Sequence, residues 1–385
     1  MVTLDGVRAA LLAGGLGQRM GPLTADTCKP MVPYAASCRL VDFSLANAAA
    51  SGVGEAVLLS LHRETELAAH VLEHWDDRAG LHVHFGAHES LIRERGLPGA
   101  GELLPARPPE RGTADALLAN APYLFAPGAT DILVLHADHV YRMDYGPMLE
   151  AHRRSGADCT IGVQAIDRRW VRLFGMVEVD DRLRVLSLIE KPEVPTSDLV
   201  FTAFCLFRAD TLREVLSGLA ATGPDGWQHD ISRDVLPAMI AGGRDVRAFP
   251  AESYWADIGT VERYHQQQLR LLAPPRPFAA EDLPLTLASA PPRFEPRLGL
   301  LGGPTAAGGG AGPADVVVED GAVVTDSVLH PGSSVAAGAT VERSVVLPGA
   351  VVGPGVRAVG TLVLGGEHLG HDREGLAGLR AVGSG

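Results

Sequence analysis

The chain has 385 residues, 46% of them hydrophobic, which is enough for one large domain with a sizeable core and a smaller second domain. Its formal net charge of −13 at pH 7 argues against broad non-specific binding to nucleic acid, because such binding needs a basic surface. The four cysteines form no Cys-x-x-Cys pair, no apolar run reaches the length of a membrane span and no signal peptide opens the chain, so we expect a cytoplasmic protein with reduced thiols and no membrane partner.

Residues 1–272 alternate short aliphatic runs with helical patterns, which predicts a mostly parallel sheet covered by helices. In such a sheet, ligands bind beyond the carboxyl ends of the strands. The predicted strands are Arg8–Ala13, Glu55–Ser60, Leu81–Phe85, Asp131–His136, Cys159–Val163 and Phe201–Arg208. The predicted helices are Arg39–Ser51, Arg63–His74, Ala114–Asn120 and Tyr145–Ser155.

The first predicted strand runs into the sequence GGLGQR at residues 14–19, and Lys29 follows ten residues after it. Glycines after a strand let backbone N–H groups approach a phosphate chain, and Arg19 and Lys29 add cations that can bind the same phosphates. The spacing excludes a Walker A loop and the G-x-G-x-x-G dinucleotide fingerprint. The pattern favours an enzyme that handles a nucleoside triphosphate, and a glycine-rich turn without a ligand is the alternative.

Two acidic residues are candidates for metal binding. Asp138 follows a buried strand, where a carboxylate is well placed to hold Mg²⁺ between phosphates, and a solvated turn residue is the alternative. Asp257 lies in the segment YWADIGT at residues 254–260. Two carboxylates from such distant segments can share one metal ion.

Two further segments allow both a functional and a structural interpretation. Lys191 can neutralise a sugar phosphate while Glu190 accepts sugar hydroxyls, or the two form a surface ion pair before a turn. Thr113, in the sequence RGTADA at residues 111–116, either caps a helix or belongs to an edge of small residues at which a purine approaches the backbone.

Several histidines lie close together in the sequence. Their spacing is loose and the cysteines lie elsewhere, whereas zinc usually recruits its ligands in a closed pattern. We therefore favour solvated or half-buried histidines over a zinc site. These histidines are His70, His74, His82, His84 and His88.

The composition changes after residue 272. Residues 273–313 are rich in Pro, Gly and Ala, which predicts an irregular linker. In residues 314–365 aliphatic side chains recur six apart, which favours a parallel β-helix over antiparallel hairpins. This segment is short for an independent solenoid, so we expect it to pack against the large domain or another subunit, and we expect residues 366–385 to form a flexible tail. The hexad positions are Val317, Val323, Leu329, Val335, Val341 and Leu347.

Taken together, these segments resemble the bacterial ADP-glucose pyrophosphorylases (glucose-1-phosphate adenylyltransferases). The order and spacing of the shared motifs hold from residue 7 to about residue 270, and the C-terminal hexads also match. RLVDFSLAN and DHVYRMDY are specific to this family. The matching motifs include LAGGLGQR (12–19), KP (29–30), RLVDFSLAN (39–47), DHVYRMDY (138–145), EKP (190–192) and YWADIGT (254–260).

The resemblance implies a nucleotidyltransferase domain joined to a left-handed parallel β-helix, in a homotetramer or an assembly with a paralogous subunit. It implies that the enzyme makes ADP-glucose and pyrophosphate from ATP and glucose 1-phosphate, for glycogen or a related α-glucan. The implied catalytic residues are Arg19, Lys29, Asp138 and Lys191; those at the nucleotide are Leu12, Ala13, Gly14, Gly15, Gly17, Gly112, Thr113 and Asp115; Gly175, Glu190 and Lys191 bind the sugar phosphate, and Asp138 and Asp257 hold Mg²⁺.

The sequence departs from the family pattern at the sugar pocket and the regulatory region. Glu110 stands where a tyrosine is expected, Phe201 where a serine contacts glucose, and Ala137 where a glycine precedes the metal-binding Asp. Residues 25–27 lack the basic side chains often linked to effector binding. Two alternatives follow: an enzyme for another hexose phosphate, such as an amino sugar whose ammonium suits Glu110, and a non-catalytic regulatory subunit.

Overall fold

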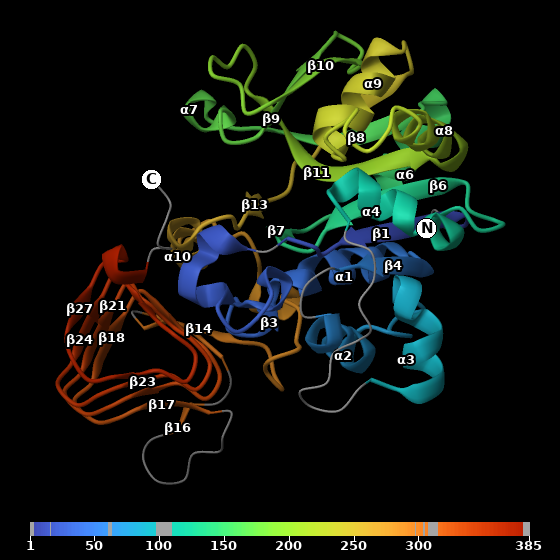
Figure 1. Ribbon diagram of the computed structural model, residues 1–385. Helices are drawn as coiled ribbons and strands as arrows, with labels where there is room; N and C mark the ends of the chain where they lie inside the picture. Colours follow the sequence, from blue (N-terminus) through green and yellow to red (C-terminus); the bar gives the residue numbers. More distant parts are fainter. Residues whose placement is uncertain are drawn as a thin grey trace. The chain divides into compact units, whose positions relative to one another are not determined.

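The computed structural model describes residues 4–15, 17–60, 64–97, 110–296, 298–302, 305–306 and 315–379, and the chain forms two compact units (Figure 1). The first unit comprises Met1–Gly14, Ser44–Ala137 and Tyr141–Trp255. The second comprises Gly15–Phe43, Asp138–Val140 and Ala256–Gly385. These units differ from the predicted domains, because three segments of the predicted catalytic domain, residues 15–43, 138–140 and 256–272, group with the C-terminal part.

The first unit is built around one large sheet of mixed direction. Its main path runs in the order β10-β9-β11-β6-β1-β4-β5, while β8 pairs with β11 and with β12. The strands are β1 (Val7–Leu12), β4 (Glu55–Leu59), β5 (His82–His84), β6 (Asp131–His136), β8 (Cys159–Ala165), β9 (Gly175–Val179), β10 (Val185–Glu190), β11 (Leu199–Arg208) and β12 (Val246–Pro250).

The parallel part of this sheet determines where the loops that follow β1 and β6 begin. β1 lies between β4 and β6 and runs parallel to both, and its residues Ala9–Leu11 are fully buried. An apolar strand covered on both faces is typical of a parallel sheet. At its carboxyl end Ala13 N donates to Leu59 O at 2.8 Å, and Ala137 N donates to Leu12 O at 3.0 Å. The strand ends before Gly14 and Asp138 therefore meet at one edge, as predicted.

The mostly parallel α/β fold is confirmed, and the antiparallel part of the sheet is what the sequence did not predict. β11 runs antiparallel to β6, β8 and β9, and β10 runs antiparallel to β9. β11 contains a bulge between Phe201 and Cys205, in which Ala203 adopts a left-handed φ of 65°. A bulge bends a strand and redirects its side chains, and here it directly follows Phe201.

Helices cover this sheet and connect its strands (Figure 1). α6 shows how the sequence sets their ends: Asp144 Oδ1 accepts from Gly146 N at the start, and Gly156 adopts a φ of 66° at the end. Among the described residues, none of the helices has the length and apolar character that a bilayer crossing needs. Their bounds are α1 (Leu40–Ser51), α2 (Glu64–His74), α3 (Glu89–Arg95), α4 (Thr113–Ala119), α5 (Ala121–Leu124), α6 (Tyr145–Ser155), α7 (Arg168–Val171), α8 (Ala209–Ala220), α9 (Leu236–Ala241) and α10 (Val261–Arg270).

The second unit contains a parallel β-helix, visible in Figure 1 as stacked orange and red coils. In the described residues its walls are the sheets β14-β15-β19-β22-β25, β16-β17-β20-β23-β26 and β18-β21-β24-β27. Their strands are β14 (Arg293–Glu295), β15 (Gly299–Leu301), β16 (Thr305–Ala306), β17 (Val316–Val318), β18 (Val323–Thr325), β19 (Ser327–Leu329), β20 (Ser334–Val335), β21 (Thr340–Glu342), β22 (Val345–Val346), β23 (Val351–Val352), β24 (Arg357–Val359), β25 (Leu362–Val363), β26 (His368–Leu369) and β27 (Arg373–Glu374).

The period of the β-helix corrects the predicted hexads. Val328 pairs with Val345 and Thr340 with Arg357, so these coils advance by 17 residues rather than 18. The buried positions Leu329, Val335, Val341 and Val346 show that two steps of six are followed by one of five. A strict hexad therefore loses register within one coil, and Val323, predicted to face inward, is 52% exposed.

Buried hydroxyls join successive coils at one corner. Ser344 N donates to Ser327 Oγ at 3.1 Å, and Thr361 N donates to Ser344 Oγ at 3.1 Å. The three residues are fully buried and lie 17 apart, so a hydroxyl recurs in each coil, and those of Ser327 and Ser344 each accept from a backbone N–H of the next coil.

The segments on either side of the predicted β-helix are more ordered than expected. In the predicted linker, Thr286 Oγ1 donates to Asp42 Oδ2 at 2.5 Å and Phe278 packs against Phe43, while β15 already pairs with β19.

At the other end β26 and β27 extend the coils to residue 374, so the predicted tail begins too early. Within it, Gly366 and Gly375 adopt left-handed φ values of 68° and 69°. Residues 380–385 of that tail lie outside the described part of the chain, as does Arg63, the first residue of one predicted helix.

A buried polar contact joins α10 to the β-helix within the second unit. The Gln268 side-chain oxygen accepts from Ala35 N at 3.1 Å, and its amide nitrogen lies 3.4 Å from His330 Nε2. Gln268 and His330 are both fully buried. Burial lowers the pKa of His330 to about 3, so the folded protein keeps this imidazole neutral at physiological pH.

We expect His330 to make the second unit less stable in acid. A histidine takes up a proton near pH 6.5 in the unfolded chain, so stability falls as the pH drops below that value, by roughly 2 kcal/mol at pH 5. His330→Asn should lose less stability between pH 7.5 and pH 5 than the unchanged protein, measured as urea midpoints. The exposed His368→Asn is the control and should keep the original pH dependence; equal pH dependence in all three proteins would contradict the assignment.

Candidate active site

A buried lysine and two carboxylates form the charged centre of the second unit. Lys29 is 6% exposed, and its Nζ lies 2.5 Å from Asp138 Oδ2 and 3.9 Å from Asp257 Oδ1. Asp138 directly precedes β7 (His139–Tyr141), and Asp257 ends β13 (Trp255–Asp257). Because β7 and β13 pair, two acids that are 119 positions apart in the printed sequence become neighbours.

His139 belongs to the same cluster and was not among the predicted site residues. Its Nε2 lies 3.7 Å from Asp138 Oδ1 and 3.7 Å from Asp257 Oδ1, and the side chain is buried. The sequence carried a signal, since His139 is the second residue of the DHVYRMDY motif, but a lone histidine beside an acid is not specific.

Arg19 reaches this cluster from the glycine-rich loop. A Cβ placed on Gly259 would lie 3.0 Å from Asp257 Oδ2 and 3.5 Å from an Arg19 guanidinium nitrogen, so both side chains border that glycine. Gly17 has a left-handed φ of 65°, and a Cβ there would come within 3.0 Å of Lys29 and Thr24 side-chain carbons. The loop thus needs glycine at position 17 for both its backbone conformation and its packing.

The donor set of this cluster fits a magnesium ion. Carboxylate oxygens are the hard ligands that Mg²⁺ takes in proteins, and Asp138 and Asp257 supply them from one small region. The absence of a side chain at Gly259 keeps open the space beside Asp257 and Arg19. Asp138 and Asp257 are therefore the residues that would hold the ion.

In the first unit, the predicted nucleotide-binding segment at residues 112–115 is held tightly in place. A Cβ on Gly112 would lie 2.3 Å from His229 O, so no other residue fits there without a shift. Thr113 is the first residue of α4 rather than its cap; its hydroxyl donates to Asp230 Oδ2 at 3.1 Å and accepts from Ile231 N at 2.9 Å. Asp115 Oδ2 accepts from Arg111 N at 2.9 Å. These contacts hold the segment in place, and the Thr113 hydroxyl already donates one hydrogen bond and accepts another.

The predicted sugar-phosphate residues also come together in the first unit. Gly175 of β9 pairs with Glu190 of β10, and a Cβ on Gly175 would lie 3.2 Å from Glu190 Oε2 and 3.6 Å from Phe201 Cβ. Lys191 follows with a left-handed φ of 50°, and its half-exposed Nζ lies 3.4 Å from Glu190 Oε1. Phe201 is 9% exposed and belongs to the hydrophobic core of the first unit, with its Cβ beside Gly175.

The remaining predicted nucleotide-binding residues divide between the two units. Leu12, Ala13 and Gly14 belong to the first unit, where Leu12 ends β1 and Ala13 is buried. Gly15 and Gly17 belong to the second unit, and a Cβ on Gly15 would meet no atom within 4 Å. Leu16, between them, lies outside the described residues.

Comparison with known proteins defines the class of this enzyme. The family model for nucleotidyl transferases matches residues 8–273, and the chain belongs to that family. The chain is therefore an enzyme of the nucleotidyltransferase class, as the glycine-rich loop and the resemblance predicted.

Among the relatives compared, one is named a guanylyltransferase and the others are named adenylyltransferases. The chain is 48% identical over 342 residues to a valienol-1-phosphate guanylyltransferase of Streptomyces hygroscopicus subsp. limoneus, covering 86% of this chain and 88% of the relative. It is 28% identical over 356 residues to glucose-1-phosphate adenylyltransferase 2 of Vibrio vulnificus, covering 86% and 81%. It is 30% identical over 294 residues to the glucose-1-phosphate adenylyltransferase of Bacillus licheniformis, covering 75% and 73%. The resemblance to ADP-glucose pyrophosphorylases is confirmed.

We expect Asp138→Asn and Asp257→Asn each to abolish turnover while the fold survives. Losing one carboxylate from a metal site should cost several kcal/mol of transition-state stabilisation, which corresponds to a rate loss of roughly a thousandfold. Pyrophosphate release at saturating Mg²⁺ measures the effect, with circular dichroism as the test of folding. The exposed Asp320→Asn of the β-helix is the control; near-normal rates in both site variants would show that these acids hold no essential metal.

Proposed function

We propose that the chain transfers a guanylyl group from GTP to the 1-phosphate of a carbocyclic sugar analogue of the valienol type, with release of pyrophosphate. The identity to the valienol-1-phosphate guanylyltransferase, 48%, far exceeds the 27–33% to the adenylyltransferases, and it extends over most of both chains. The proposed substrates differ from glucose 1-phosphate and ATP, which the resemblance implied. They agree with the alternative that the acceptor is another 1-phosphate.

The choice of acceptor rests on the side chain of Phe201. Its Cβ lies 3.6 Å from the position that a Cβ on Gly175 would take, and Phe201 stands where the resemblance puts a serine that contacts glucose. A phenyl group offers no hydrogen bond, so it removes a polar contact to a sugar and supplies apolar surface instead. Valienol is an unsaturated cyclitol, and its ring carbons replace the polar ring oxygen of glucose. An apolar wall suits that ring better than a pyranose.

The site residues keep the roles that the resemblance implied. Lys191 neutralises the acceptor phosphate, Glu190 accepts ring hydroxyls, and Gly175 leaves room for the ring. Arg19 and Lys29 bind the leaving phosphates, and Gly14, Gly15 and Gly17 contact the triphosphate. Gly112, Thr113 and Asp115 border the base.

An oxygen of the acceptor phosphate attacks the α-phosphorus of the nucleotide, the bond to the bridging oxygen breaks, and pyrophosphate carries away the negative charge. No covalent intermediate with the protein is needed, so positioning and charge neutralisation account for the catalysis. Bound Mg²⁺ would supply further neutralisation of the triphosphate. As before, we propose a homotetramer or an assembly with a paralogous subunit.

A matrix of substrates tests the function. Pyrophosphate release is measured for GTP and ATP, each with valienol 1-phosphate, glucose 1-phosphate and glucosamine 1-phosphate. We expect GTP with valienol 1-phosphate to give the highest kcat/KM. If ATP with glucose 1-phosphate is fastest, the chain makes ADP-glucose for an α-glucan and this proposal is wrong. Absence of turnover with every pair, in a protein that still binds nucleotide, would identify a non-catalytic subunit instead.

We expect the double variant Glu110→Tyr with Phe201→Ser to bind glucose 1-phosphate more tightly. Replacing the carboxylate that stands where the resemblance puts a tyrosine, and adding a hydroxyl contact, should lower KM for glucose 1-phosphate about tenfold, with a smaller change in kcat. Steady-state kinetics with both acceptors measure the change. Phe201→Leu, which keeps an apolar side chain, is the control and should leave the acceptor preference unchanged. A higher KM for glucose 1-phosphate in the double variant would show that these residues do not face the acceptor.

A further inference from the structure

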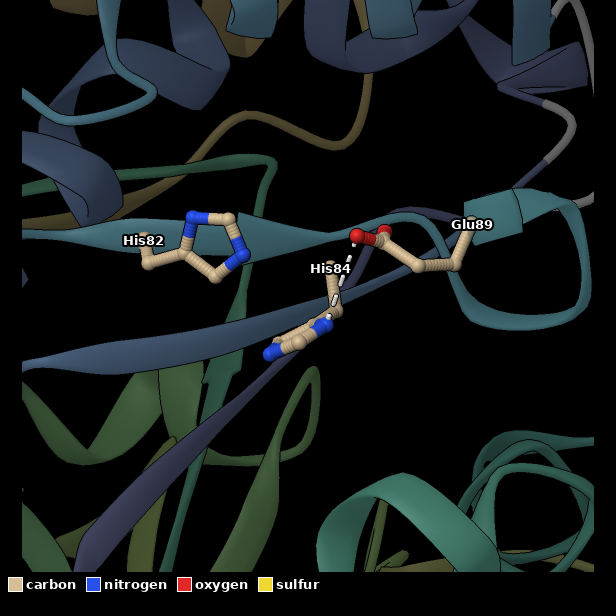
Figure 2. A group of neighbouring side chains, drawn as sticks. All are labelled: His82, His84 and Glu89. Carbon is tan, nitrogen blue, oxygen red and sulfur yellow. Dashed lines mark ion pairs between the residues drawn. The ribbon is translucent and has the colours of Figure 1, made fainter. Parts of the chain in front are cut away.

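A group of metal-ligating side chains lies in the first unit, apart from the residues assigned to catalysis. His82 and His84 are alternate residues of β5, and Glu89 is the first residue of α3 (Figure 2). Val83 between the two histidines is fully buried, so both imidazoles lie on the opposite face of the strand. One ligand atom from each of the three residues lies within 4.8 Å of the other two.

The orientation of each side chain suits a shared ion. Figure 2 shows the Glu89 carboxylate turned toward the two rings, and His84 Nδ1 lies 3.6 Å from Glu89 Oε1. That nitrogen is buried and makes no hydrogen bond in the structure. His82 Nδ1 lies 3.4 Å from Asp76 Oδ1, which leaves His82 Nε2 for a metal. A carboxylate behind a ligating histidine is the usual outer contact of such sites.

Glu89 is also fixed from outside the cluster. Its Oε2 accepts from Phe85 N at 2.7 Å, and its Oε1 accepts from Arg93 Nε at 3.0 Å. These bonds hold the carboxylate in place. The guanidinium also draws charge from Glu89, so we expect a weaker site than a closed set of four cysteine or histidine ligands.

Contrary to the expectation from the sequence, which favoured histidines without zinc, we propose that His82, His84 and Glu89 bind a zinc ion that connects β5 to α3. Two imidazoles with one carboxylate favour a borderline ion such as Zn²⁺ over Mg²⁺ or Ca²⁺, which prefer oxygen ligands. Zinc bonds of about 2.0–2.1 Å require ligand atoms roughly 3.3 Å apart, so the ligand atoms must close in by at most about 1.5 Å. Rotation about side-chain bonds supplies that movement, and a water molecule completes the fourth position.

The place of the cluster in the fold gives the ion a structural role. In the described part of the chain β5 has three residues and pairs with β4 alone, so it is a short strand at the edge of the sheet. A short edge strand has few hydrogen bonds to hold it. An ion that ties β5 to the following helix would keep this edge closed. The proposal does not rest on the substrates or the reaction proposed above.

The test is zinc binding by the full-length protein. The protein is treated with a chelator, and Zn²⁺ is then titrated against a coloured competing chelator with excess Mg²⁺ present to occupy carboxylate sites. We expect one zinc ion per chain, with affinity reduced at least tenfold in His84→Ala and in Glu89→Gln. Co²⁺ offers a second readout, because a four-coordinate site absorbs visible light much more strongly than hydrated Co²⁺. His84→Gln is a milder variant in case His84→Ala does not fold.

Two controls separate this site from its surroundings. His368→Ala removes an exposed histidine of the β-helix and should bind zinc normally. Asp77→Asn removes a member of the neighbouring group Asp76, Asp77 and His82, and it should also bind normally. Zinc binding that persists unchanged in both His84 variants and in Glu89→Gln would overturn the proposal. Loss of binding in Asp77→Asn with retention in His84→Ala would do so as well, because it would place the ion in the neighbouring group.

Discussion

Lys29 carries a positive charge into the interior of the second unit, and the organisation of the candidate site depends on how that charge is balanced. Moving an ammonium out of water costs several kcal/mol unless an opposite charge lies close by. Asp138 and Asp257 supply that charge from two other segments of the chain. The balance therefore holds the segment around Lys29, the start of β7 and the end of β13 together. Those are the segments that carry the strongest sequence motifs.

The central strands of the parallel sheet were predictable because β1 and β6 are short aliphatic runs followed two residues later by a glycine and an acid. The predicted strand Asp131–His136 matches β6, and the predicted helix Tyr145–Ser155 matches α6. The antiparallel strands β9 and β10 were harder to predict. β10 combines buried Val185 and Leu188 with exposed Leu186 and Ile189, so polarity did not mark its buried positions.

The sequence indicated the chemical roles of the candidate site residues, but it did not show how these residues lie relative to one another. A glycine-rich loop and a strand-end acid identify phosphate handling, and the structure brings Arg19, Lys29, Asp138 and Asp257 into one unit. The sequence could not show that His139 faces both acids, because that contact depends on the pairing of β7 with β13. The same limit applied to His82 and His84. Their alternation predicts a common face, but Glu89 reaches them only because a tight turn separates β5 from α3.

The 17-residue coil has a consequence for how the β-helix can change length. Ser327, Ser344 and Thr361 recur at that interval, and so do the left-handed glycines Gly321, Gly338 and Gly355. A tandem duplication or loss of 17 residues would keep every corner hydroxyl above its neighbour and every glycine in its turn. A change of 18 residues, the natural unit of a hexad solenoid, would shift all later coils by one position and turn their valines outward. In this protein the exchangeable module is thus the whole coil, and the hexad is not a unit that evolution or design can add freely.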